Sequence, residues 1–417
     1  MKINLLLATL LLNVIVLKAQ YVTIPDTNFV SWLQTNVPSA MIGNQMDTTS
    51  TAVLNMPELS IQNNPVIDLS GIQYFKNLVR LSCNFDSIQI LPPLPNSIKT
   101  LQCSFNPNLD SITEFPDSLE QLSCSHNNLS SLPPFPNGLF SIDCGKNLLT
   151  SLPQLPDSLR DLDCYSNLLT SLPALPGSIK IIQAFENHLT ILPVLRNSLT
   201  LLDIRENQLT DLPTLPDSLR ILMCSYNFLT SIPPLPNKLN HLHCTNNLIT
   251  GLPDLPANLE ALECDSNFIT CLPILPEYLV YSESFPNGSS INGNPITCLP
   301  NYTLGMTPTE LAFPLCLIND TIHNPHGCAG DPNNAVNSIE KEKLLYVFPL
   351  PFNYEFIIEG DFSDTPVSIV DIYGREIIHA KMYDNRNPIN TENWKAGIYF
   401  LRIIDENGIA VKKLIKE

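Results

Sequence analysis

The sequence predicts a mainly β protein: a solenoid of parallel strands with a polyproline-like convex side and little helix, followed by a small C-terminal β-sandwich. Three observations lead to this prediction. An apolar pattern recurs about every twenty residues from Leu78 to about Leu272, the chain holds 37 prolines but only 15 glycines, and short alternating strands begin at Leu344. A repeat of this length is a single supersecondary unit, which buries its apolar face only against its neighbours.

The first segment has the features of a signal peptide. Lys2 precedes an apolar run, and Ala19 marks the expected cleavage point. No later stretch approaches the ~20 apolar residues of a spanning helix, so we expect an exported chain with no transmembrane segment. The net charge of −18 excludes nucleic acid as a partner, because phosphate groups would be repelled.

Each copy of the repeat follows the pattern LxxLxCxxNxL and continues into LPxLP. Around Leu162, Asp163 and Cys164, alternation sends leucine and cysteine inward and aspartate outward, as in a strand that is buried on one side. We therefore expect about ten parallel strands, ~4.8 Å apart, whose outward residues form a concave face. The proline-rich return segment is too short for a full helix and favours an extended backbone.

One asparagine per copy lies where the chain turns away from the strand, and Asp86 takes this place in the first copy. An inward amide at this point can bond unpaired backbone groups of its own turn and the next, whereas burial without such bonds would cost roughly 1–3 kcal/mol. We interpret this row as structural. It consists of Asn106, Asn127, Asn147, Asn167, Asn187, Asn207, Asn227, Asn247 and Asn267.

Eight cysteines share one inward position of the repeat, and Ala184 and Ile204 fill it in two further copies. The position therefore accepts small hydrophobic side chains. Neighbouring cysteines would be separated by the strand spacing of about 4.8 Å, which exceeds the ~3.8 Å between the β-carbons of a disulfide. We predict buried free thiols at Cys83, Cys103, Cys124, Cys144, Cys164, Cys224, Cys244 and Cys264.

Four further cysteines do not share this position: Cys271, Cys298, Cys316 and Cys328. Four cysteines allow three pairings. In an exported protein we expect disulfides that staple a cap over the open end of the array. Proximity in the sequence favours a bond between Cys316 and Cys328.

The middle of the expected concave face carries a candidate binding surface. The third residue of each copy is polar as far as Asp161 and apolar from Ile181 to Ile221, with aromatic and charged residues around it. Contiguous exposed apolar groups with a charged rim are typical of binding patches, although single exposed apolar residues are common. The candidate ligand-binding residues are Tyr165, Ile181, Phe185, Leu201, Arg205, Ile221, Met223 and Tyr226.

Motifs for catalysis are missing from the sequence, which contains no glycine-rich phosphate loop, no H-E-x-x-H pair and no nucleophile elbow. We therefore expect no enzyme, no cofactor and no metal. Two alternatives stay open: His241 and His243, with Glu263 beside them, could bind zinc, and Asp143 with Asp163 could hold Ca²⁺. Exposed histidines and carboxylates are, however, ordinary on a polar face.

The combined pattern resembles the short leucine-rich repeats of bacterial secreted effectors and of surface proteins of Gram-negative bacteria: LPxLPxSLxxLxCxxNxLTSLP. Upstream, two segments resemble the N-terminal cap and first turn of internalin-like repeat proteins: IPDTNFVSWL (24–33) and DLSGIQYFKNLVRL (68–81). The resemblance implies a leucine-rich-repeat fold for the array.

The C-terminal segment resembles the type A sorting domain of type IX secretion cargo. The matching motifs are DIYGREI (371–377), AGIYFLRI (396–403) and a basic end, while PLPFN (349–353) departs from the usual Pro-Asn-Pro. The resemblance implies an immunoglobulin-like β-sandwich that type IX secretion machinery recognises through residues 341–417. It also implies export to the outer cell surface of a Gram-negative bacterium.

Together these features predict a monomeric, secreted leucine-rich-repeat protein that binds a protein or a glycan through its concave face. A structural or adhesive coat component without a specific ligand is the alternative. The expected organisation is a signal peptide (1–19), an N-terminal cap and first turn (20–77), the leucine-rich-repeat array (78–300), a C-terminal cap and linker (301–340) and the sorting domain (341–417).

Overall fold

The computed structural model describes residues 20–277, 279, 290–303, 313–316, 322, 324–330, 346–348, 351–359, 365–371, 375–382, 386–405 and 408–417. These residues form two compact units, each of which is described by itself. The first contains the N-terminal cap and the strands of the array, and the second contains the disulfides and the tail. The predicted signal peptide, 1–19, lies outside the described residues.

The N-terminal cap combines a small antiparallel sheet, in the order β1-β3-β2, with short helices. Helix α1 begins after Asp26, whose Oδ1 accepts hydrogen bonds from the backbone N–H groups of Asn28 and Phe29, both at 2.8 Å. Its Oδ2 accepts one from the N–H of Ile67 at 2.7 Å, which ties the helix to the first coil of the array. The cap elements are β1 (Tyr21–Thr23), α1 (Thr27–Asn36), η1 (Pro38–Ala40), β2 (Met41–Ile42), β3 (Gln45–Asp47), α2 (Thr51–Leu54) and η2 (Ile72–Tyr74).

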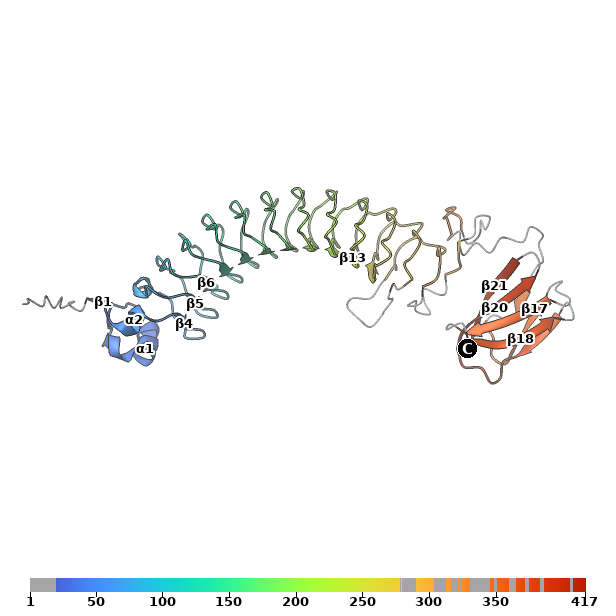
Figure 1. The fold of residues 1–417 in the computed structure, drawn as a ribbon, viewed down its shortest axis with the longest axis horizontal. Coiled ribbons are helices and arrows are strands. Elements are labelled where there is room, and N and C mark those ends of the chain that lie inside the picture. The colour runs from blue at the N-terminus through green and yellow to red at the C-terminus, as the bar shows by residue number, and fades with distance from the viewer. Residues whose placement is uncertain are drawn as a thin grey trace, which may run out of the picture. The chain divides into compact units, whose positions relative to one another are not determined.

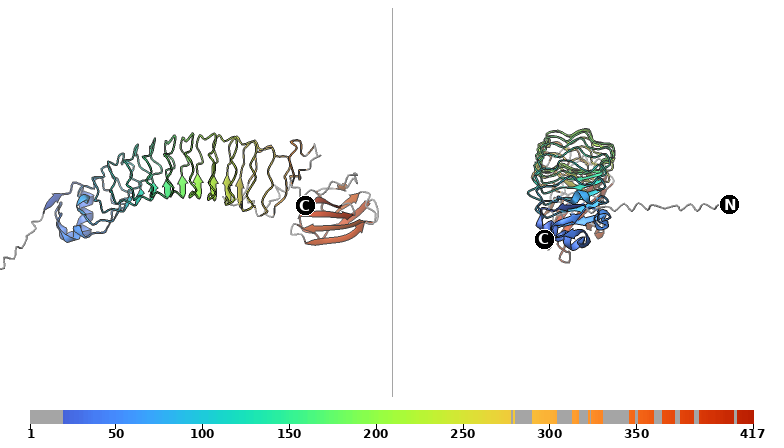
Figure 2. Two further views of the ribbon diagram at one scale, coloured as in Figure 1. Left: turned by 45° about the horizontal axis from the view of Figure 1, so that its top comes forward. Right: turned by 90° about the vertical axis from the view of Figure 1, so that its left-hand side faces the viewer.

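Eleven strands of three residues each form one parallel sheet in the order β4 to β14. They pair in register, so that Leu162 of one coil lies beside Ile182 of the next. Figures 1 and 2 show the strands side by side along the inner side of the curved array, with the return segments on the outer side. The strands are β4 (Glu58–Ser60), β5 (Arg80–Ser82), β6 (Thr100–Gln102), β7 (Gln121–Ser123), β8 (Ser141–Asp143), β9 (Asp161–Asp163), β10 (Ile181–Gln183), β11 (Leu201–Asp203), β12 (Ile221–Met223), β13 (His241–His243) and β14 (Ala261–Glu263).

Strand β4 was not expected from the repeat pattern, which begins at Leu78, and it lies in the segment assigned to the N-terminal cap and first turn. Its coil has buried Leu59 and Ile61 at the inward positions and Asn64 at the turn, but it lacks the ladder cysteine. The coil therefore keeps the geometry of the repeat with only part of its sequence signature.

Leucine, isoleucine and cysteine side chains fill the inside of the coils. In one copy, Leu159, Leu162, Cys164 and Leu169 are fully buried, and the same positions are buried in the other copies. The described residues from 75 to 277 contain no helix, because the proline-rich return segments keep an extended backbone. This confirms the predicted mainly β solenoid with little helix.

The described residues of the tail form seven strands in two antiparallel sheets, with the orders β15-β16-β19 and β18-β17-β20-β21. Phe352, Phe356, Leu401 and Leu414 form a buried core, and Trp394 packs against it. These sheets agree with the predicted small β-sandwich. The strands are β15 (Tyr346–Phe348), β16 (Glu355–Glu359), β17 (Thr365–Asp371), β18 (Glu376–Met382), β19 (Arg386–Asn390), β20 (Gly397–Asp405) and β21 (Gly408–Lys416).

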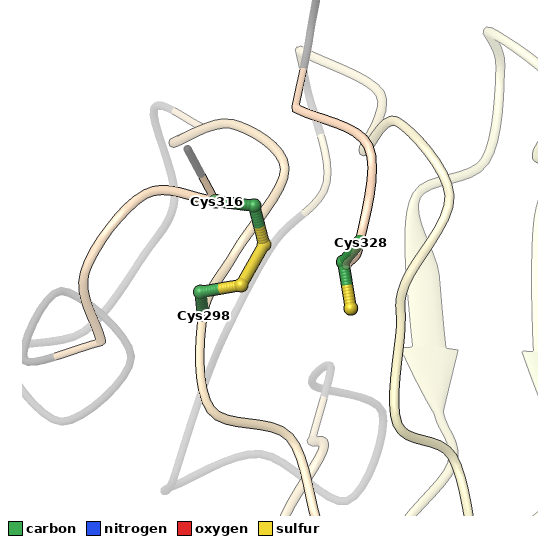
Figure 3. A group of neighbouring side chains, drawn as sticks. All are labelled: Cys298, Cys316 and Cys328. Atoms are coloured by element: carbon green, nitrogen blue, oxygen red, sulfur yellow. A yellow bond between two sulfur atoms is a disulfide. The ribbon is translucent and has the colours of Figure 1, made fainter. Parts of the chain in front are cut away.

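The second unit contains two disulfides, Cys271–Cys328 and Cys298–Cys316. The predicted pairing of Cys316 with Cys328 is therefore wrong. The backbone N–H of Cys316 donates to the carbonyl oxygen of Leu299 at 2.8 Å, and this contact between neighbouring segments brings Cys316 beside Cys298. Figure 3 shows this bond with Cys328 next to it. Contact between neighbouring segments, rather than nearness in the sequence, decides the partners.

Candidate functional site

Every coil from β5 to β14 sets its outward side chains through the same backbone geometry. The residue before the turn asparagine, or before Asp86 in the first of these coils, has a φ between 48° and 59°. This left-handed backbone is uncommon for residues other than glycine and asparagine. We call it the margin position, because it follows the concave strand directly. Its occupants are Phe85, Phe105, His126, Lys146, Ser166, Glu186, Glu206, Tyr226, Asn246 and Ser266.

The asparagine row links neighbouring coils through its side-chain amides. The Nδ2 of Asn167 donates to the carbonyl oxygens of Cys144 at 3.0 Å and of Cys164 at 3.2 Å. Its Oδ1 accepts from the N–H of Leu149 at 3.0 Å. The amide therefore bonds its own coil and the preceding one, whereas the sequence suggested the following one. All nine asparagines of the row are buried.

The eight ladder cysteines are buried and free, and the pKa of each thiol is raised by burial, in the case of Cys103 to about 12. A thiol becomes nucleophilic only as the thiolate, so these groups are packing residues rather than reactive ones. The ladder thus contributes core and no chemistry to the concave face.

The aliphatic part of the predicted binding surface forms a column across three strands. Ile181 on β10, Leu201 on β11 and Ile221 on β12 lie in register, and each is partly exposed. Met223 ends β12 and is also partly exposed. We call these four residues the aliphatic column.

The aromatic part of the prediction lies in the same coils. Tyr165 stacks on Phe185, with ring centroids 4.8 Å apart, and the guanidinium of Arg205 lies 5.3 Å from the centroid of Phe185. Arg205 is fixed by the buried Asp203, to which its Nε and Nη2 donate at 2.9 and 2.7 Å. Tyr226 is exposed at its margin position, and no described ring contact joins it to the other two aromatic residues.

A second aromatic group, which the sequence analysis missed, lies at the margin position of three consecutive coils. Phe85 stacks on Phe105 with centroids 4.3 Å apart, and Phe105 stacks on His126 at 4.0 Å. Phe85 is 52% exposed and Phe105 is 37% exposed. We call these three residues the aromatic row. The available signal was the presence of large rings at a position that holds lysine, serine or glutamate in the following coils.

The two aromatic groups meet at Gly145. A β-carbon built on this residue would overlap the ring of Tyr165, so only glycine leaves the space that the ring occupies. Tyr165 in turn contacts His126 edge-on, with centroids 6.4 Å apart. One line of rings therefore runs from Phe85 to Phe185.

The geometry does not favour the zinc alternative. The Nδ1 of His243 lies 3.2 Å from Glu263 Oε2, while the Nδ1 of His241 is 3.1 Å from Asn240 Oδ1. Within the described part of the chain, the one group of three or more candidate ligands with converging donor atoms is Cys298, Cys316 and Cys328. Their sulfurs are all engaged in disulfides and therefore are not thiolate ligands.

The two aspartates considered for Ca²⁺ already accept hydrogen bonds from neighbouring side chains. Asp143 Oδ2 accepts from the hydroxyls of Ser123 and Ser125, and Asp163 Oδ2 accepts from Gln183 Nε2 at 3.0 Å. Burial, and secondarily the charge of Asp143, raises the pKa of Asp163 to about 7. Both carboxylates are therefore already engaged within the sheet.

Comparison with known proteins agrees with this architecture. Residues 346–417 match the family described as the secretion system C-terminal sorting domain. The chain is a leucine-rich-repeat solenoid with a secretion sorting domain. No helix in the described part of the leucine-rich-repeat protein has the length and apolar character needed to cross a bilayer. No curated protein matches the chain significantly.

Among solved structures, YopM from Yersinia enterocolitica is 33% identical, with a TM-score of 0.54; the match covers 60% of this chain and 58% of YopM. The leucine-rich-repeat domain of a Shigella effector is 30% identical, with a TM-score of 0.30; the match covers 42% of this chain and 70% of the effector chain. The functional domain of InlJ from Listeria monocytogenes includes a cysteine ladder. It is 18% identical, with a TM-score of 0.40, and the match covers 96% of this chain and 100% of the InlJ chain.

Proposed function

We propose that this leucine-rich-repeat protein is displayed on the outer surface of a Gram-negative bacterium, where it binds another macromolecule, a protein or a glycan, through its concave face. The sorting domain at 346–417 supports this location, because domains of this family direct a cargo to its secretion system. The binding role rests on the surface chemistry of strands β9 to β12.

The observation that carries the binding proposal is the aliphatic column beside a fixed cation. Three in-register residues of the column leave apolar surface in water, and contact with a partner would recover ~25 cal/mol for each Å² buried. Arg205 is already ordered by Asp203 and Phe185, so it would lose little freedom on binding. An apolar centre with an ordered arginine at its edge is typical of protein contacts.

A charge placed in the column tests this surface. In the Leu201→Glu variant we expect at least tenfold weaker retention of the protein on surfaces coated separately with fibronectin, collagen and mucin, wherever the natural chain is retained. Ile191→Glu is the matched control, because Ile191 is a 66% exposed aliphatic residue outside the concave strands. Equal retention of both variants, or no retention of the natural chain on any coating, would contradict the proposal.

The route to the surface is tested by removing residues 341–417. We expect the full chain in the surface fraction of the producing cells and the shortened chain inside the outer membrane. Protease accessibility on intact cells measures the difference. A shortened chain that is still digested from outside would show that the tail is dispensable for display.

A further inference from the structure

A cleft of about 420 Å³ lies where helix α1 meets the first coil of the array. Its walls contain amides, hydroxyls and one tryptophan, and none of the lining residues carries a charge. The lining residues are Asn28, Ser31, Trp32, Thr35, Asn36, Asn63, Asn64 and Pro65.

Two amides of this cleft, those of Asn28 and Asn36, are held in place through their nitrogens. Asn28 Nδ2 donates to the carbonyl oxygen of Pro65 at 2.8 Å, and Asn36 Nδ2 donates to that of Trp32 at 2.8 Å. The Oδ1 atoms of both residues, and the whole carboxamide of Asn63, accept or donate no hydrogen bond within the described part of the chain. The cleft therefore presents oriented acceptors and a free amide to a ligand with hydroxyl groups.

The cleft lies next to the aromatic row in the stack of coils. Ser60 of β4 pairs with Ser82 of β5, and three residues further along each coil come Asn63 and Phe85. Both have left-handed backbone, with φ values of 61° and 58°, so Asn63 occupies the margin position of the first coil. Asn63, which lines the cleft, thus holds the position one coil before the first ring of the row.

The rings of the row are not needed by the coil itself. Left-handed backbone costs roughly 1–2 kcal/mol for any residue with a β-carbon, so a phenylalanine ring gives the coil no conformational advantage at this position. Later coils place Lys146, Ser166 and Glu186 at the margin position. Phe85 and Phe105 nevertheless occupy it and stay exposed, which indicates a role in contact rather than in folding.

Between Arg80, which pairs with Glu58 at one end of the row, and Lys146, which follows His126 at the other, the side chains of the row itself are neutral. Burial, and then the charge of Lys146, lowers the pKa of His126 below its usual value, which favours the neutral ring. The strand residues that face the solvent beside the row include Thr100, Gln102 and Gln121, all with neutral hydrogen-bonding side chains. Apolar ring edges therefore run beside hydroxyl and amide groups.

We propose that the Trp32 cleft and the aromatic row form one binding track for a neutral oligosaccharide. Sugar rings have apolar C–H faces, which pack against aromatic side chains, and hydroxyl groups, which pair with amides and hydroxyls. A charged peptide or acidic glycan would find no opposite charge among the residues that line the cleft. The track is separate from the aliphatic column, so it does not depend on the function proposed above.

The two tryptophans of the chain give a direct readout. Trp394 packs in the tail against Phe352 and Phe356, so in a Trp394→Phe background the emission comes from Trp32 alone. The exported chain is titrated with cellohexaose, laminarihexaose and maltohexaose, and with hexagalacturonate as the acidic probe. We expect a shift of Trp32 emission with at least one neutral hexasaccharide and none with hexagalacturonate.

Substitutions in the row then test the track. Phe105→Ser and Phe85→Ser are expected to weaken binding of the responding hexasaccharide about tenfold, which corresponds to ~1.4 kcal/mol. Phe228→Ser is the matched control, because Phe228 is as exposed as Phe85, at 52%, but lies outside the row. Circular dichroism establishes that each variant is folded.

Four results would overturn the proposal: no response to any neutral hexasaccharide, tighter binding of hexagalacturonate, equal losses in the Phe105 and Phe228 variants, or a loss caused by Leu201→Glu and not by Phe105→Ser. The last result would place the saccharide on the aliphatic column, and it would support the function proposed above while rejecting the track. Retained saccharide binding in Leu201→Glu is the expected outcome.

Discussion

The ring of Tyr165 occupies the space above Gly145 that a β-carbon at that position would fill. This placement lets Tyr165 reach His126 on one side and Phe185 on the other, with centroid distances of 6.4 and 4.8 Å. Lys146 holds the margin position of the intervening coil, so the aromatic line would otherwise be interrupted there. A missing side chain in one coil thus makes two groups of rings continuous.

Substitution of Gly145 by alanine should therefore destabilise the array. The added methyl group must displace the Tyr165 ring, and overpacking of this kind costs about 1–3 kcal/mol. Gly177→Ala is the control, because nothing lies within 4 Å of a β-carbon built there. Urea unfolding followed by circular dichroism measures both variants. A Gly145 variant as stable as the Gly177 variant would mean that the ring moves aside without cost.

The asparagine row gives a second prediction. In Asn167→Ala, the carbonyl oxygens of Cys144 and Cys164 each keep one amide partner from a neighbouring asparagine, at 3.1 and 3.0 Å. The buried N–H of Leu149 loses its acceptor, so we expect a loss of about 2–3 kcal/mol in the free energy of unfolding.

Asn128→Ala is the control for this variant, because Asn128 is exposed and makes a single side-chain bond to Pro107. We expect its stability to change by less than about 0.5 kcal/mol. Similar losses of unfolding free energy in the two variants would show that a buried asparagine of the row contributes no more to stability than an exposed one.

Thiol titration tests the cysteine ladder. Because burial keeps the eight ladder thiols protonated and shielded, we expect almost no reaction of the native protein with Ellman's reagent. In guanidinium chloride without reductant eight thiols should react, and after reduction all twelve cysteines. Fewer than eight in the unreduced denatured protein would reveal a disulfide within the ladder.

The repeat could be predicted from the sequence because its burial is local and periodic. Leu162 and Cys164 show their direction by alternation, and in-register stacking multiplies that signal over the copies. The aromatic row was missed because the sequence analysis looked for exposed rings only around the apolar strand residues Ile181 to Ile221, whereas the left-handed backbone also leaves Phe105 exposed in an early coil.

Contacts between different coils could not be predicted from the sequence. The pairing of Cys298 with Cys316 depends on which segments lie side by side, and the first coil was overlooked because Ile61 stands where later copies have cysteine. The space over Gly145 likewise depends on the neighbouring copy. Each of these features joins residues that no single copy contains.

The pH dependence of stability provides a final prediction, centred on Asp163. Burial raises its pKa in the folded protein to about 7, well above the usual 3.8. Between these values the folded chain binds a proton that the unfolded chain releases, so this residue makes stability fall as pH rises from about 4 to about 7. Asp163→Asn removes that loss, and its unfolding midpoint should exceed that of the natural chain more at pH 8 than at pH 4.

The exposed Asp157 supplies the control, since Asp157→Asn lies in a return segment and should leave the difference between the two pH values unchanged. Burial also raises the pKa of Asp86, to about 6, so Asp86 makes stability fall with rising pH in every variant, although over a narrower range. The effect of Asp163 is therefore the difference between the variants, not the whole pH dependence of one variant. An Asp163→Asn midpoint that gains no more at pH 8 than at pH 4 would show that the pKa of this carboxyl is not raised in the folded protein.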